Sequence, residues 1–276
     1  MTINCKGKLV DLSIPKVMGI LNLTPDSFYD GGKYKDEGAI LNQAENMLAE
    51  GATFIDLGAY SSRPGANHVP EDEEKKRILP VLELLLKHFP ETFFSIDTFR
   101  SSVASQCLEM GAALINDISA GNLDPEMFNV VARFQVPYIL MHLKGTPQSM
   151  QKKAVYDNLT KDLLLYFSEK IEKAHALKIN DIIIDPGFGF AKTLEQNYHM
   201  LYHLDIFQTL NKPILIGLSR KSMIYKALKS SAKEALNGSS VLHGIALLKG
   251  ANLLRVHDVK EAQECITLLE TLKANA

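Results

Sequence analysis

The stretch FFSIDTFRSSVASQCLEMGAALIND, residues 93–117, contains one complete copy of the pattern from which the chain is built. Its first apolar run ends at Asp97 and its second at Asn116 and Asp117, as expected of short strands buried on both faces. Between them, Ser101 to Met110 is expected to be helical and is followed by Gly111, a residue typical just beyond a helix C-terminus. Strand, helix and strand in this order predict a parallel β-α-β unit with a right-handed crossover.

Eight apolar runs of this kind recur along the chain, each with a polar residue at or near its end. The other six cover residues 17–21, 53–55, 138–141, 182–184, 213–216 and 253–254; they lead to Asn22, Asp56, His142, Asp185, Ser219-Arg220-Lys221 and Arg255-Val256-His257. Further helices are expected over residues 39–50, 71–88, 124–134, 156–177, 193–210 (with a break), 239–249 and 258–272.

This alternation predicts an α/β protein, a (β/α)8 TIM barrel that forms a single domain over residues 1–276. An open doubly wound sheet is the alternative, but it usually has fewer strands, and no G-x-G-x-x-G turn follows the first run. In a closed barrel the C-terminal strand ends meet on one rim, where active sites are built. The polar residues that follow the runs are therefore expected around one pocket.

Composition limits the classes of function. The net charge of −2 gives no electrostatic case for binding nucleic acid or an anionic membrane. The three widely spaced cysteines fit a reducing cytoplasm, the N-terminus is too polar for a signal peptide, and no apolar run approaches the roughly 18 residues that span a bilayer. We therefore expect a soluble cytoplasmic protein.

Two segments after the first two runs combine residues that a core would not select. Residues 22–32 mix hydroxyls, acids and aromatic rings before a Gly-Gly pair, which suits a loop that closes over a ligand. Residues 58–65 place Arg63 beside two serines and between glycines, which suits a phosphate oxygen. The alternative is that both are ordinary solvated turns.

Cationic side chains near the last two runs suggest a second anion site. Arg255 and His257 are two residues apart on a strand and therefore point to the same side. Lys221 lies in the loop just after the run at 213–216, although an exposed lysine with no role is the alternative there. These residues could hold an anionic substrate on a rim of a protein with little net charge.

The acids at the strand ends suit a different ligand. Asp97 and Asp185 can each accept two hydrogen bonds, and Asn116 can both donate and accept. Such a set fits a flat heterocycle that carries an amino group next to a ring N–H. For Asp56 a structural ion pair is an equal alternative. His142 is expected to support the pocket floor, and no histidine spacing indicates zinc.

Seven segments, taken together, resemble dihydropteroate synthases, the pterin-binding barrels of folate biosynthesis. They are Asn22-Leu-Thr-Pro-Asp-Ser-Phe, Ser62-Arg-Pro-Gly, Ser95-Ile-Asp-Thr, Ile115-Asn-Asp, Ile184-Asp-Pro-Gly-Phe-Gly-Phe, Gly217-Leu-Ser-Arg-Lys-Ser and Arg255-Val-His. The resemblance implies condensation of 6-hydroxymethyl-7,8-dihydropterin diphosphate with 4-aminobenzoate to give 7,8-dihydropteroate and pyrophosphate. It also implies Mg²⁺, a homodimer and inhibition by sulfonamides that mimic 4-aminobenzoate.

The resemblance also implies roles for individual residues. The pterin would be held by Asp97, Asn116, Asp185 and Lys221, and Asp56 is counted among the substrate-binding residues. The diphosphate would be surrounded by Asn22, Arg63, Arg255 and His257, with Asn22 contributing to Mg²⁺ binding. The 4-aminobenzoate would be bordered by Phe28, Ser62, Pro64, Phe190, Ser219 and Lys221. The catalytic set is Arg63, Asp97, Asp185, Lys221, Arg255 and His257. Since a neutral arylamine needs no strong base, the absence of a Ser-His-Asp or Cys-His arrangement from the sequence is expected.

Two positions depart from the family pattern, and three other classes of function compete. Tyr60 stands where many members have an acid, and Ser62 where they have threonine. A methyltetrahydrofolate-dependent methyltransferase would share the acid–amide pocket but have no diphosphate for Arg63, Arg255 and His257 to hold. A phosphosugar isomerase or aldolase barrel would usually need a lysine on a strand. A non-catalytic barrel would have no reason to keep both residue sets.

Overall fold

The computed structural model describes residues 1–23, 29–30, 33–34, 37–61 and 68–276, of which 29–30 and 33–34 are described by their backbone. Within this part of the chain, eight parallel strands form one sheet in the order β10-β9-β8-β7-β6-β3-β12-β11. The strands are β3 (Lys16–Asn22), β6 (Phe54–Gly58), β7 (Phe93–Asp97), β8 (Leu114–Asp117), β9 (Tyr138–Met141), β10 (Ile182–Asp185), β11 (Leu215–Ile216) and β12 (Leu253–Val256).

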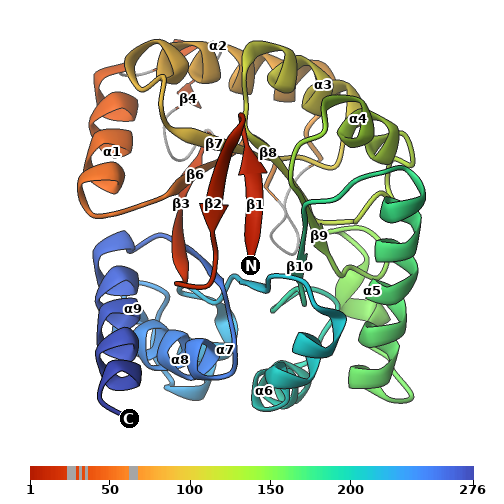
Figure 1. Ribbon diagram of the computed structural model, residues 1–276, viewed down its shortest axis with the longest axis vertical. Coiled ribbons are helices and arrows are strands. Elements are labelled where there is room, and N and C mark those ends of the chain that lie inside the picture. Colours follow the sequence, from red (N-terminus) through yellow and green to blue (C-terminus); the bar gives the residue numbers. More distant parts are fainter. Residues whose placement is uncertain (24–28, 31–32, 35–36, 62–67) are drawn as a thin grey trace.

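A bridge between the outermost strands of that order closes the sheet into a barrel. Ile184 of β10 pairs in parallel with Ile214, the residue before β11, and its N–H donates to the carbonyl of Pro213 at 2.9 Å. The helices surround the sheet in Figure 1. The prediction of a TIM-type α/β barrel is therefore confirmed.

The helices follow the predicted alternation closely. They are α1 (Glu37–Ala49), α2 (Glu71–His88), α3 (Ser101–Met110), α4 (Met127–Phe134), α5 (Leu159–Ala176), α6 (Leu194–Tyr202), α7 (Ser222–Ala227), α8 (Leu236–Leu248) and α9 (Val259–Ala274), with 3-10 turns η1 (Met150–Lys153) and η2 (Leu204–Leu210). α3 ends at Gly111 in the left-handed conformation, with φ of 114°. The break expected within residues 193–210 separates α6 from η2. The short helix α7 was not predicted.

Each strand is buried on both sides, as its composition predicted. Side chains such as Ile55, Leu57 and Ile96 pack outward against the helices in the main hydrophobic cluster. Inward-facing apolar residues near the strand N-termini, including Phe54 and Leu114, form a separate cluster inside the barrel. Burial of apolar area on both faces is the main stabilising contribution to such a sheet.

An N-terminal hairpin, absent from the sequence predictions, covers the N-terminal end of the barrel. β1 (Thr2–Cys5) and β2 (Lys8–Asp11) pair antiparallel around a Lys6-Gly7 turn in which both residues have positive φ. Ile3 and Val10 pack into the inner cluster at the strand N-termini. Figure 1 shows the hairpin lying across the front of the barrel. The hairpin closes one end, so the site must be sought at the opposite rim.

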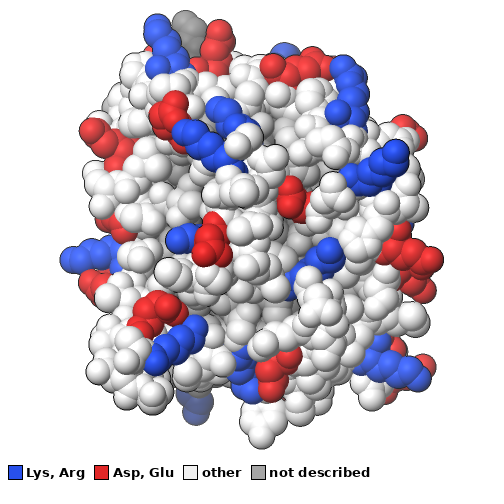
Figure 2. Space-filling view, in the orientation of Figure 1, with Lys and Arg blue, Asp and Glu red and all other residues white. Residues whose placement is uncertain are grey.

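The surface carries mixed charge. Lys and Arg side chains are interspersed with Asp and Glu on the face seen in Figure 2, without a large patch of one sign. Among the described residues, none of the helices combines the length and apolar character needed to cross a membrane.

Candidate active site

The strand register gathers the predicted polar residues at one level of the C-terminal rim. Asn22 of β3 pairs with Gly58 of β6, Gly58 pairs with Asp97 of β7, and Asp97 pairs with Asn116 of β8. These four neighbours face the mouth of the barrel together because parallel strands in register point their side chains to the same side. Gly58 leaves open the space beside Asp97, whose Oδ2 lies 3.4 Å from where a Cβ would be.

Arg255 of β12 links the carboxylate of Asp97 at this rim to that of Asp56 beneath it. Its Nε donates to Asp56 Oδ2 at 2.6 Å and its Nη2 donates to Asp97 Oδ2 at 2.7 Å. Asn116 Nδ2 donates to the same Oδ2 of Asp56 at 3.0 Å. Asp56 does not end its strand, because β6 continues to Gly58, so its fully buried carboxylate lies one layer beneath Asp97. The ion pair considered for Asp56 is therefore present, with Arg255 as the partner.

The electrostatics around Asp97 and Asp56 favour a ligand that donates hydrogen bonds to their oxygens. Burial raises the pKa of Asp97 to about 7; Arg255 opposes that rise, and the neighbouring charge of Asp56 adds to it. Asp56 Oδ1 and Ser95 Oγ, on paired residues of β6 and β7, are buried without a hydrogen-bond partner among the described atoms. A carboxyl group that titrates near neutrality suits recognition of a ring N–H and an adjacent amino group.

Asp185 and Lys221 form the other side of the pocket. Asp185 Oδ1 accepts a hydrogen bond from the Gly187 N–H at 2.7 Å, and burial raises the pKa of Asp185 although Lys221 opposes the rise. Lys221 Nζ donates to the Phe188 carbonyl and lies 4.7 Å from the centre of the Phe190 ring. Burial lowers the pKa of Lys221 to about 8, partly offset by Asp185.

His257 and Ser219 are held together where β11 and β12 end. Ser219 Oγ lies 3.1 Å from His257 Nδ1 and accepts the backbone N–H of His257 at 3.2 Å. Arg220, by contrast, makes a bidentate ion pair with Asp258, both contacts being 2.8 Å. Ser219 and Lys221 are therefore directed to the groups at the rim, while the guanidinium of Arg220 is bound to Asp258.

Four predicted site residues, Phe28, Ser62, Arg63 and Pro64, lie outside the described residues, so their roles stay predictions. Tyr60, just before them, is buried; its hydroxyl accepts a hydrogen bond from Gln148 Nε2 at 2.9 Å and its ring packs edge-on against Phe99. Tyr60 thus fills a packed position between Gln148 and Phe99.

Sequence reasoning missed Lys192. Its side chain is only 3% exposed, and its Nζ lies 3.1 Å from His142 Nδ1, 3.0 Å from the Gly187 carbonyl and 3.1 Å from the Phe190 carbonyl. No periodic pattern marks this lysine; the available signal is its position two residues after Phe190 in a glycine-rich loop. His142 is buried beneath the same loop, and burial lowers its pKa to about 2, so the ring is neutral.

Oxygen ligands for a metal are sparse in the described part of the chain. No group of three or more His, Cys, Asp or Glu side chains there is arranged to hold an ion. Asn22 supplies one side-chain amide at the rim level defined above. Mg²⁺ keeps several waters and is commonly bound through one or two carboxylates together with substrate phosphates, so the Asn22 amide oxygen would be one protein ligand beside waters and the diphosphate.

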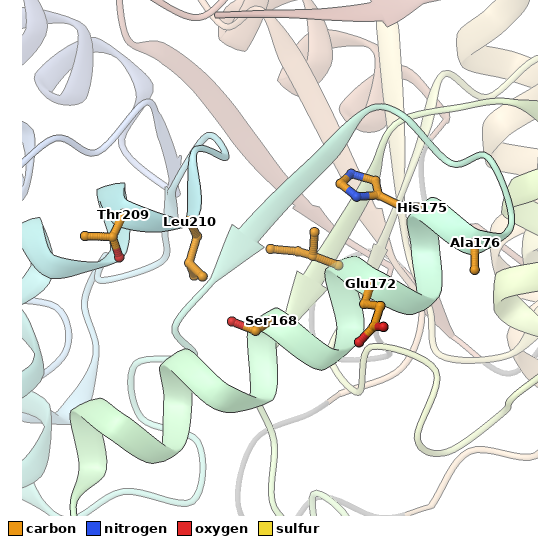
Figure 3. A pocket seen from close by; sticks show the side chains of 7 residues that line it. Ser168, Glu172, His175, Ala176, Thr209 and Leu210 are labelled. Atoms are coloured by element: carbon orange, nitrogen blue, oxygen red, sulfur yellow. The ribbon is translucent and has the colours of Figure 1, made fainter.

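An open hollow of about 590 Å³ lies elsewhere, between α5 and η2 (Figure 3). Its lining residues include Glu172 and His175 of α5 and Thr209 of η2. None of the predicted site residues lines it, so it is separate from the rim.

Comparison with known proteins identifies relatives that match over the full chain. The model of the "Pterin binding enzyme" family matches residues 18–257. Dihydropteroate synthase of Escherichia coli K12 is 41% identical over 99% of this chain and 98% of its own length. The Yersinia pestis enzyme solved with a sulfonamide drug superposes with a TM-score of 0.92 at 41% identity, covering 99% of this chain and 100% of that one. The Thermus thermophilus enzyme solved with 4-aminobenzoate gives 0.88 at 36% identity, with the same coverage.

Proposed function

Because the chain belongs to the dihydropteroate synthase family of pterin-binding enzymes, we propose that the C-terminal rim of its barrel carries the family's condensation in folate biosynthesis. In this reaction the methylene carbon of 6-hydroxymethyl-7,8-dihydropterin diphosphate loses pyrophosphate and becomes bonded to the amino nitrogen of 4-aminobenzoate, giving 7,8-dihydropteroate. The observation that carries the assignment to this rim is the bridge from Arg255 to Asp56 and Asp97, next to Asn116.

The acid–amide side of the pocket holds the pterin ring. Asp97 and Asp185 accept hydrogen bonds from ring N–H and amino groups, Asn116 donates or accepts at the ring edge, and Lys221 donates to a ring acceptor. Asp56, buried beneath them, acts on the substrate through Arg255 and Asn116, which it orients.

The cationic side of the rim holds the diphosphate. Arg255 and His257 lie near it, and Arg63, outside the described residues, is the third predicted cation. Asn22 is the side chain that would hold Mg²⁺, which when bound supplies positive charge to the leaving diphosphate. Positive groups fixed in place before reaction stabilise the negative charge that develops on pyrophosphate as the carbon–oxygen bond breaks.

The 4-aminobenzoate site is assigned to the residues that border the methylene carbon from the outer side. Phe190, Ser219 and Lys221 belong to it within the described chain, and Phe28, Ser62 and Pro64 are assigned to it by their motif positions. Solved relatives with bound 4-aminobenzoate or a sulfonamide drug support the proposal that this chain binds 4-aminobenzoate. We expect sulfonamides to compete with 4-aminobenzoate for this chain as well.

The chemistry needs no strong base. The electron-rich dihydropterin ring delocalises the positive charge that forms as pyrophosphate leaves, and the buried carboxylate of Asp97 stabilises it further. The arylamine attacks as a neutral nucleophile and afterwards gives up its proton to solvent or to the released pyrophosphate. The protein's contributions are thus binding, orientation and charge stabilisation.

A cytoplasmic homodimer completes the proposal. α8 presents Val241, Ile245 and Leu248, spaced by four and three residues, as exposed apolar side chains. Cys5, Cys107 and Cys265 are free, in agreement with a reducing compartment. Light scattering after size-exclusion chromatography should give twice the chain mass of 30.6 kDa.

The test of the function is pyrophosphate release from the pterin diphosphate in the presence of Mg²⁺, run with and without 4-aminobenzoate. We expect release to depend on 4-aminobenzoate and to match dihydropteroate one to one. Pterin binding without any release would move the function to a non-catalytic pterin-binding protein. Release without dihydropteroate would also contradict the proposal.

A further inference from the structure

The loop at residues 187–191, between β10 and α6, has every backbone carbonyl bound by a side chain. Such an arrangement is unusual, because about two-thirds of protein hydrogen bonds join backbone groups to one another. Lys192 donates to the carbonyls of Gly187 and Phe190, Lys221 to that of Phe188, Gln151 to that of Gly189 and Tyr156 to that of Ala191. The loop is thus a rigid platform at the edge of the pocket.

Lys192 is the residue that joins this platform to the barrel wall. An ammonium group has three N–H donors and no acceptor. Lys192 Nζ has three acceptors within reach, namely His142 Nδ1 at the end of β9 and the carbonyls of Gly187 and Phe190. The contact to Nδ1 assigns the imidazole proton of His142 to Nε2, since a neutral ring accepts at one nitrogen only. The protonated lysine therefore forms a complete tripod.

Packing alone does not account for a lysine at this place. Burial lowers the pKa of Lys192 to about 7, which reflects the unfavourable desolvation of its charge. The direct contacts of Nζ are three neutral acceptors, while the charge of Asp185, which makes no ion pair with Nζ among the described residues, favours the protonated form from further away. An apolar side chain would fill the same volume without this cost. The lysine instead supplies three directed bonds at one point.

The platform carries groups that the proposed function uses on both substrates. The Phe188 carbonyl fixes Lys221, which we assign to the pterin, and the ring of Phe190, which we assign to 4-aminobenzoate, lies under the same ammonium group. The 187–191 loop also packs closely against the end of β9, because a Cβ at Gly187 would come within 2.4 Å of the His142 carbonyl oxygen. A shift of this loop would therefore displace both groups together.

We propose that Lys192 is a positioning residue for the condensation, and that with His142 as its third acceptor it fixes the 187–191 loop so that Phe190 and Lys221 stand where the methylene carbon meets the arylamine. This inference rests on the proposed function of the rim. Lys192 touches neither substrate in this scheme and acts through the two residues that do.

The test compares kinetic constants for Lys192→Met with those of the wild type. Misplacement of reacting groups by about 1 Å can cost about a hundredfold in rate, so we expect the KM for 4-aminobenzoate to rise and kcat/KM to fall by about 10–100-fold. KM does not depend on the fraction of folded enzyme, so a purely structural role would leave it unchanged. Lys260→Met, on the exposed face of α9, is the matched control and should keep wild-type constants.

Two variants of His142 keep the inference testable if Lys192→Met does not fold. His142→Asn retains an oxygen acceptor close to the position of Nδ1 and should stay within about threefold of the wild-type KM for 4-aminobenzoate. His142→Leu removes the acceptor and should follow the lysine variant. Equal KM values for the Asn and Leu variants, or an unchanged KM in Lys192→Met, would overturn the inference. Absence of turnover in the wild type would instead refute the proposed function.

Discussion

Removal of the Asp56 carboxylate probes the buried network beneath the pocket. Asp56→Ala leaves Arg255 with one carboxylate, Asp97 at 2.7 Å, and leaves Asn116 Nδ2 without the acceptor that lies at 3.0 Å. Breaking a buried ion pair from one side costs about 3–5 kcal/mol, and a buried donor without an acceptor costs about 1–3 kcal/mol. Since Arg255 keeps its second partner, we expect a net loss in the free energy of unfolding of about 3–5 kcal/mol.

Calorimetry and denaturant unfolding measure this loss. A chain of 276 residues unfolds with an entropy on the order of 0.6 kcal/mol per degree, so Tm should fall by about 5–8 °C. Asp56→Asn keeps an acceptor oxygen and should lose about 1–2 kcal/mol. Asp157→Ala, at an exposed position, should stay within about 0.5 kcal/mol of wild type.

The same variant reports on function because Arg255 loses one of its two anchors. We expect kcat/KM for the pterin diphosphate to fall by about 10–100-fold in Asp56→Ala. A variant with wild-type Tm and wild-type kcat/KM would refute the reasoning, since it would show that the carboxylate neither stabilises the barrel nor orients the guanidinium.

Three further predictions concern the rim. In the proposed scheme Asp97 accepts hydrogen bonds as a carboxylate and Lys221 donates them as an ammonium group. The value of kcat/KM for the pterin diphosphate at saturating 4-aminobenzoate should therefore fall below about pH 7 and above about pH 8. A flat profile from about pH 5 to 10 would contradict these assignments. Gly187→Ala forces a Cβ to 2.4 Å from the His142 carbonyl oxygen at a φ of 75°, and should lower the free energy of unfolding by about 1–3 kcal/mol, whereas an unchanged Tm would show that the loop moves freely. Ser62→Thr keeps the hydroxyl and should leave turnover within about fivefold; a loss beyond about a hundredfold would mean that the role given to this residue is wrong.

The barrel was predictable because its strands are short, apolar and bounded by polar residues. Runs ending at Asp97, Asn116 and Asp185 lie in β7, β8 and β10, where the sequence placed them. The end of β6 was misjudged: Asp56 interrupts an apolar run, yet the strand continues to Gly58 because the buried carboxylate finds Arg255 and Asn116 inside the barrel. When the partners of a buried acid are distant in the sequence, local patterns place the end of the strand at that acid.

The N-terminal hairpin shows a signal that was present but unused. Thr2–Cys5 alternates polar and apolar residues, and this segment and Lys8–Asp11 flank Lys6-Gly7, whose glycine suits a two-residue turn with positive φ. Four-residue strands with one buried face carry little apolar periodicity, so they are easily taken for a tail. Their buried apolar side chains, Ile3, Cys5 and Val10, pack against the barrel interior, which the local sequence does not reveal.

Within the site, residue types were predictable and pairings were not. The sequence indicates that Arg255 and the acids share a rim, but the contacts join residues 199 and 158 positions apart and depend on register and barrel curvature. Lys192 could not be distinguished from a surface lysine, because its acceptors are a histidine 50 residues away and two loop carbonyls. Long-range geometry decides such contacts, and local patterns do not contain it.

The central claim is that the acid–amide set on this rim holds the pterin ring, while Arg255, which is paired with Asp56 and Asp97, holds the diphosphate beside it together with His257. The most direct test is calorimetric titration of 6-hydroxymethyl-7,8-dihydropterin, without its diphosphate, into wild type and Asp185→Asn. The substitution keeps an oxygen to accept the Gly187 N–H, so the fold should be preserved. Loss of charge-assisted hydrogen bonds should weaken pterin binding by about 10–100-fold, while inorganic pyrophosphate binds as before. Equal pterin affinity in the two proteins would remove Asp185 from the pocket and contradict the account.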